Sequence, residues 1–191
     1  MDVKLNILGF FGRSRAFEAK LEQSRPRLYR LACAWTRNQS LADDVVQNTL
    51  VQALRQSGQL RNPEAMDAWL LTIMANCWRD HFRRNRETVD IDEVGDEALA
   101  CDLTPEYEFE KNQVIQRVRR AVGCLPLGQR QVVTLIDLEE FSYADVAAIL
   151  GIPIGTVMSR LSRARLALRE LLLEYMKNPE TTVAPRISRI K

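Results

Sequence analysis

The sequence predicts an all-α protein of two small helical domains joined by an acidic linker. Through most of the chain, apolar residues recur at the spacing of amphipathic helices, and the alternation typical of strands is absent. Between Thr88 and Glu110 every charged residue is acidic, and the stretch from Thr88 to Leu103 has no helical period. With 191 residues, 46% of them hydrophobic, the chain can form two small cores. We therefore expect the linker at residues 88–104.

The N-terminal domain is predicted to span residues 15–87, after an extension formed by residues 1–14. Its first helix, at about residues 15–37, has a broad apolar face that includes Trp35. Pro26 lies within this segment, where a proline marks either a bend or a helix start.

The second and third helices each follow a residue that is suited to cap a helix. Ser40 is expected to be the N-cap of the second helix, which ends before Gly58. Asn62 and Pro63, a cap followed by proline at the first helical position, begin a third helix that runs to about residue 86.

The C-terminal domain, residues 105–177, is predicted to contain four helices. They run from about 105 to 124, 127 to 138, 143 to 150 and 153 to 177. The remaining residues, 178–191, are expected to form a flexible tail.

The last two of these helices have the pattern of a helix-turn-helix. Ser142 begins a capping-box-like sequence, and Gly151 stands where the chain has to turn sharply into the next helix. From Pro153 to Arg169 that helix carries four arginines and no acidic residue. A solvated face of an ordinary helical bundle is the alternative, but the absence of acids over this length favours DNA binding.

Several segments resemble the extracytoplasmic-function (group four) sigma factors of the sigma-70 family. Those similar to region four are 125–133, 141–147 and 155–165, and those similar to region two are 26–30, 42–50 and 68–70, together with Asn76, Asp80, His81, Arg83 and Arg84. The resemblance covers most of residues 15–173, with the segments in the family's order. It implies an alternative RNA polymerase sigma factor that directs promoter-specific transcription initiation, responds to a stress or signal, and is held by an anti-sigma partner.

The resemblance also implies two partners, core RNA polymerase and promoter DNA. The residues expected to bind the polymerase clamp form a polar edge on the second helix: Asp43, Asp44, Gln47 and Asn48. A second interpretation of Asp43 and Asp44 is that they complement the positive end of the helix dipole. The acidic linker is either a segment threaded through the polymerase or a soluble spacer, and composition alone leaves both open.

The third helix is expected to bind the opened minus-10 strand, which requires arginines along the backbone and a pocket for an unstacked base. The predicted contacts are Asn76, Arg79, Asp80, Arg83 and Arg84, with the turn at 61–67 as the base pocket. Trp69 is expected in the core. Trp78 lies at the margin of the apolar face, where a core position and a DNA contact both remain open.

The last helix is expected to bind the minus-35 element. By family position the predicted contacts are Thr156, Met158, Ser159, Arg160, Ser162, Arg163 and Arg165, with Arg160 and Arg165 nearer phosphates or packing partners. The family commonly has arginine where this chain has Met158, so we expect an unusual minus-35 preference.

We expect no cofactor, no metal site and no catalytic residues. Four separated cysteines and a single histidine make a zinc site improbable and fit a reduced, cytoplasmic setting. The apolar run from Leu5 to Phe11 is too short for a signal peptide or a membrane span. The alternative function is a self-sufficient helix-turn-helix regulator whose N-terminal half senses an effector or dimerises.

Overall fold

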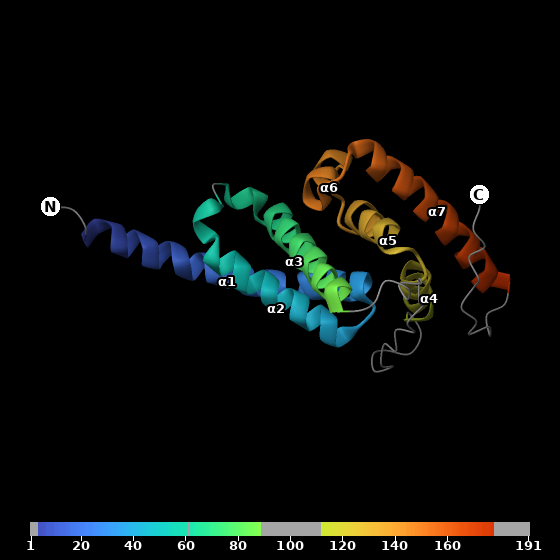
Figure 1. Ribbon diagram of the computed structural model, residues 1–191, viewed down its shortest axis with the longest axis horizontal. Helices are drawn as coiled ribbons and strands as arrows, with labels where there is room; N and C mark the ends of the chain where they lie inside the picture. Colours follow the sequence, from blue (N-terminus) through green and yellow to red (C-terminus); the bar gives the residue numbers. More distant parts are fainter. Residues whose placement is uncertain (1–3, 61, 89–111, 178–191) are drawn as a thin grey trace.

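The computed structural model describes residues 4–60, 62–88 and 112–177, and within these ranges it contains helices and turns but no strand (Figure 1). The N-terminal helical domain comprises α1 (Lys4–Thr36), α2 (Gln39–Arg55), two short 3₁₀ turns (Ser57–Gln59 and Pro63–Ala65) and α3 (Met66–Thr88). The C-terminal helical domain comprises α4 (Asn112–Gly123), α5 (Leu127–Val133), the π-helical turn η3 (Thr134–Leu138), α6 (Tyr143–Leu150) and α7 (Ile154–Lys177). The all-α prediction is confirmed. Apart from Thr88, the predicted linker and the tail lie outside the described residues.

Three details of the N-terminal helical domain differ from the sequence-based expectation. Helix α1 begins at Lys4, well before the predicted start at about residue 15, so most of the predicted extension at 1–14 is part of this helix. Asn38, not Ser40, caps α2: Arg37 adopts a left-handed conformation (φ 57°), which leaves Asn38 extended so that its side chain accepts the Leu41 N–H at 3.0 Å. Pro26 lies inside one continuous α1 and does not begin a helix.

The expected helix at 127–138 widens after its first two turns into the π-helical turn η3. The Thr134 hydroxyl lies 2.8 Å from the Arg130 carbonyl, and so competes for an acceptor of the regular ladder. The Glu139 N–H then bonds the Thr134 carbonyl five residues back. Glu140, in a left-handed conformation (φ 59°), turns the chain towards α6.

The two domains share one hydrophobic cluster. Leu28, Trp35 and Met74 from the first domain belong to the same cluster of buried side chains as Leu135 and Val157 from the second. Helix α6 packs against α3, and α5 packs against α1 (Figure 1). The chain beyond the linker therefore folds back onto α1 and α3.

The tryptophans of α3 also differ from expectation. Trp78 is buried, with only 3% of its surface exposed, whereas Trp69 is half-buried and packs against Phe17. Of the two alternatives left open for Trp78, the structure therefore shows the core position and not an exposed DNA contact.

Candidate nucleic-acid interface

Local hydrogen bonds fix the helix-turn-helix formed by α6 and α7. Ser142 Oγ accepts the Asp145 N–H at 3.1 Å, which caps α6 as predicted, and donates to Asp145 Oδ2 at 2.6 Å in a contact between the two side chains. Gly151 has φ 62°, a conformation that glycine adopts without steric cost, and Ile152 N–H donates to the Ala147 carbonyl at 3.1 Å. The two helices cross at 105°, within the range of this motif.

The buried face of the motif determines which side of α7 reaches solvent. Val146 on α6 and Val157 and Ala164 on α7 are each fully buried. The opposite side of α7 carries Met158, Ser159, Ser162 and Arg163, all exposed, with Thr156 half-buried beside them. These five residues are among those predicted for the minus-35 element, and they form one surface at the start of α7.

Two of the predicted arginines have packing partners inside the domain. Arg165 Nη2 and Nε donate to the two carboxylate oxygens of Asp137 at 2.6 and 3.1 Å, and the hydrogen bond raises the pKa of Arg165. The guanidinium of Arg160 lies over the start of α5, since a Cβ at Gly128 would come within 2.9 Å of Arg160 Cζ. Both arginines therefore have packing partners within the C-terminal helical domain, and their expected place beside phosphates stays a prediction.

The predicted minus-10 residues lie along one side of α3. Asn76, Arg79 and Arg83 are exposed and Asp80 is half-buried, while the side chain of Arg84 lies outside the described part of the chain. Arg79 donates to Asn76 Oδ1 and to the Ala75 carbonyl, and Arg83 lies 3.4 Å from Asp80. Both arginines remain exposed with these contacts in place.

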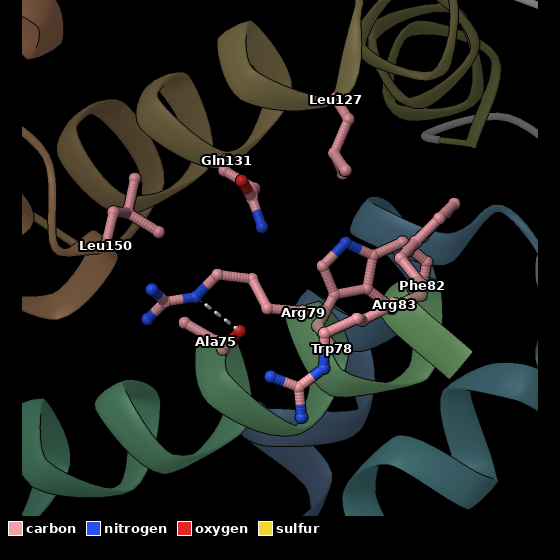
Figure 2. A pocket seen from close by; sticks show the side chains of 8 residues that line it. All are labelled: Ala75, Trp78, Arg79, Phe82, Arg83, Leu127, Gln131 and Leu150. Carbon is pink, nitrogen blue, oxygen red and sulfur yellow. Dashed lines mark hydrogen bonds between the residues drawn. The ribbon is translucent and has the colours of Figure 1, made fainter. Parts of the chain in front are cut away.

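The same side of α3 faces the C-terminal helical domain across a pocket of about 400 Å³. Figure 2 shows side chains of α3 facing others from α5 and α6; the lining comprises Ala75, Trp78, Arg79, Phe82, Arg83, Leu127, Gln131 and Leu150. A Cβ at Gly151 would lie 3.4 Å from Arg79 Nη1, so this guanidinium rests against the turn of the helix-turn-helix. Sequence reasoning missed this contact, because no local signal encodes it.

The polar edge of α2 is exposed as predicted: Asp43, Asp44, Gln47 and Asn48 all reach solvent. Since α2 begins at Gln39, Asp43 and Asp44 lie beyond its first turn, where the helix dipole no longer acts strongly. The edge continues into Val51 and Leu54, which are 44% and 48% exposed. Exposed apolar side chains with polar ones around them fit the apolar centre and polar rim of a protein interface.

Other kinds of site have little support in the described residues. No group of three or more His, Cys, Asp or Glu side chains in these ranges is arranged to hold a metal ion. Cys33, Cys77 and Cys124 are half-buried, and none of these three takes part in a disulfide within the described part of the chain. Among the described helices none is by itself long and apolar enough to cross a membrane; only the sharply bent α6–α7 pair reaches that length and composition.

Comparison with known proteins gives matches in both domains. The sequence profile described as Sigma-70 region 2 matches residues 21–88, and that described as Sigma-70, region 4 matches residues 115–168. The chain is 35% identical to the ECF RNA polymerase sigma factor EcfG of Rhodopseudomonas palustris (strain TIE-1), over 77% of this chain and 80% of that protein. It is 34% identical to the ECF RNA polymerase sigma factor SigM of Mycobacterium tuberculosis (strain ATCC 25618 / H37Rv), over 90% of this chain and 84% of the relative.

Solved structures agree with these matches. The sigma factor RpoE from Bartonella quintana, in complex with the anti-sigma factor NepR, superimposes with a TM-score of 0.68 at 34% identity, covering 83% of this chain and 98% of that one. CnrH in complex with the cytosolic domain of CnrY gives a TM-score of 0.57 at 27% identity, covering 84% and 89%.

Proposed function

Because this chain belongs to the extracytoplasmic-function group of the sigma-70 family, we propose that it directs core RNA polymerase to specific promoters as an alternative sigma factor. The exposed start of α7 carries the proposal: Arg163 and its small neighbours stand on a helix without acidic residues between Pro153 and Arg169. Such a helix can enter a major groove. A self-sufficient regulator is not favoured, since residues 21–88 match sigma region 2 and not a sensing domain.

The minus-35 element is proposed to meet Thr156, Met158, Ser159, Ser162 and Arg163. Arg163 is the long cationic donor among them, and a guanidinium recognises guanine bidentately or neutralises a phosphate. Met158 is 55% exposed and offers an apolar contact, such as a thymine methyl, in place of a charge. Arg160 and Arg165, which are engaged with α5 and Asp137, are proposed to hold the helix in position beside the phosphates.

The minus-10 element is proposed to meet Asn76, Arg79, Asp80, Arg83 and Arg84 on α3, with the turn at 61–67 as the pocket for an unstacked base. Arg79 and Arg83 supply the charge that attracts an exposed backbone, and Phe82, which is 43% exposed, offers a stacking surface beside them.

The polar edge of α2 is proposed to bind the polymerase clamp, with Val51 and Leu54 adding apolar contact area. Replacing Asp44 by arginine is expected to weaken binding to core polymerase by about tenfold or more, because a like charge then faces a surface that accepts carboxylates. Fluorescence anisotropy of the labelled chain against core polymerase measures this. Glu22→Arg, an equal charge change at an exposed position of α1, is the control and should bind as wild type. If Asp44→Arg bound core polymerase as tightly as the wild type, the proposal that α2 contacts the polymerase would be wrong.

An anti-sigma factor is the partner expected to control this activity, since RpoE and CnrH were each solved with such a partner or with its cytosolic domain. The protein is proposed to act in the cytoplasm, where core polymerase and the chromosome are found. A stress or another signal is expected to release the chain from its anti-sigma partner. We propose that the protein itself catalyses no reaction and that the polymerase carries the chemistry.

In vitro transcription tests the proposed function directly. Core polymerase with the purified chain, given a library of genomic DNA fragments, is expected to start transcripts at a small set of positions that share minus-35 and minus-10 sequences. The reaction without the chain is the reference. Start sites that are the same with and without the chain would contradict the proposal.

A further inference from the structure

The pocket between α3 and the C-terminal helical domain has apolar walls and a charged opening. Its volume of about 400 Å³ lies within the range of small-molecule sites. Ala75, Trp78 and Leu150 line its buried part, whereas Arg79 and Phe82 are exposed at its edge. A ligand in this pocket therefore meets apolar side chains at depth and a cation where the pocket opens to solvent.

The indole N–H of Trp78 is an unpaired donor in the wall of this pocket. Trp78 is 3% exposed, and no acceptor in the described part of the chain pairs with its Nε1. A buried donor without an acceptor destabilises a fold, so an acceptor brought by a ligand is favoured at this position. Figure 2 shows the indole nitrogen on the edge of the ring that faces Leu127 and Gln131. The nitrogen has almost no solvent contact, so the half-buried Leu127 side chain has to change rotamer when such an acceptor enters.

Gln131 presents a second polar group to the same space. Its amide points from α5 toward α3 in Figure 2, and among the described residues no side chain or carbonyl bonds it. An amide both donates and accepts hydrogen bonds. Together with the Trp78 N–H it forms a short polar edge at the apolar end of the pocket, which suits a ligand that carries acceptors on a ring.

The opening of the pocket is electropositive. Arg79 donates to the Asn76 side chain and to the Ala75 carbonyl, both of which are neutral. Arg83 lies 3.4 Å from Asp80, which offsets its charge, so the charge of Arg79 is the one left without a carboxylate. Among the described residues, those that line the pocket include two arginines and no acidic side chain. A guanidinium in this setting favours an anionic group, which it binds through charge-assisted hydrogen bonds.

Phe82 adds a flat apolar surface beside this charge. It is 43% exposed, and its ring packs edge-on against Trp78 with the ring centroids 4.6 Å apart. The exposed face of such a ring is suited to stacking with another ring.

We propose that this pocket binds a small aromatic anion, whose ring lies against Phe82, whose acidic group meets Arg79 and whose acceptor atom pairs with the Trp78 N–H. Nucleoside monophosphates and aromatic carboxylic acids share this chemistry. The ligand contacts α3, α5 and α6 at once, so it binds the two domains in their packed arrangement and not either domain alone. Arg79 and Arg83 are also proposed contacts of the minus-10 strand, so the bound ligand competes with that strand. This competition rests on the proposed function, whereas the binding itself does not.

Isothermal titration calorimetry of the full chain tests the site with two probes, adenosine monophosphate and naphthoate. At least one of them should bind with a Kd below about 1 mM, and the tighter one identifies the kind of ligand. Adenosine and naphthamide are the matched neutral compounds, and the neutral counterpart of the bound acid should bind at least about tenfold more weakly, because it has no charge for Arg79. If neither acid bound below this concentration, or if the neutral counterpart bound equally well, the anion site would be wrong.

Two pairs of variants locate the binding within the chain. Arg79→Gln should weaken the bound acid by about tenfold or more, whereas Arg55→Gln, the same change at an exposed position of α2 outside the pocket, should bind as wild type. Trp78→Phe keeps an aromatic ring and removes the N–H, so it should weaken binding roughly threefold to tenfold. Trp69→Phe is the same change on the same helix, outside the pocket, and should have no effect.

Circular dichroism of each variant checks that the helices are retained. Equal binding by Arg79→Gln and Arg55→Gln would overturn the site, and equal binding by Trp78→Phe and Trp69→Phe would overturn the role of the indole donor. These measurements need neither promoter nor polymerase, so their failure is distinguishable from a failure of the transcription assay.

Discussion

Replacing Trp35 by alanine is expected to lower the free energy of unfolding by about 3–5 kcal/mol, the usual range for removing a buried aromatic side chain. Trp35 is 2% exposed and lies in the hydrophobic cluster that both domains share. The change leaves a cavity next to α5 and also leaves the Thr134 hydroxyl without its indole donor. Urea denaturation followed by circular dichroism at 222 nm, a standard helical wavelength, gives the value.

Two further variants separate the contributions to this loss. Trp35→Phe keeps most of the apolar volume and loses the hydrogen bond, so it should cost only about 1–2 kcal/mol. Trp69→Ala removes a half-buried indole and should cost clearly less than Trp35→Ala. If Trp35→Ala lowered the free energy of unfolding by less than Trp69→Ala does, the placement of Trp35 between the domains would be wrong.

Replacing Arg163 by alanine is expected to weaken promoter binding by the polymerase holoenzyme by about 1–3 kcal/mol, or roughly fivefold to 150-fold. Arg163 is exposed at the start of α7, on the side opposite the buried Val157 and Ala164. Stability should change little, because the side chain is exposed. Competition binding to a promoter fragment at a fixed, moderate salt concentration measures the effect.

Arg169→Ala is the matched control for this experiment. It removes the same charge from the same helix, six residues further on and on a different side, and should leave promoter affinity within about twofold. A comparable loss of promoter affinity in both variants would indicate that the positive charge of the helix matters and not the position of Arg163. No loss in Arg163→Ala would mean that α7 does not dock through this face.

The helix-turn-helix could be predicted almost to the residue. The predicted helix at 143–150 is α6 as observed, because Ser142 and Gly151 act within a few residues of the positions that they cap. The cap of α2 was predicted two residues too late, since the left-handed turn at Arg37 has no sequence signal in a non-glycine residue. The π-helical turn at Thr134 was missed for a related reason, because threonine at that spacing fits an α-helix equally well.

The sequence by itself determined the helices, their amphipathic faces, the acidic stretch between two domains and the exposed residues of α2, α3 and α7. Periodicity and caps are local properties, and each is written within a few turns of chain. Only the tertiary structure decided that Arg27 meets Glu139, 112 residues away, and that Trp35 meets Thr134, 99 residues away. Such pairs depend on how two finished surfaces dock, and each partner alone resembles an ordinary polar or core residue. For that reason the sequence predicts the helices and their exposed faces, and only the fold shows how the two domains pack against each other.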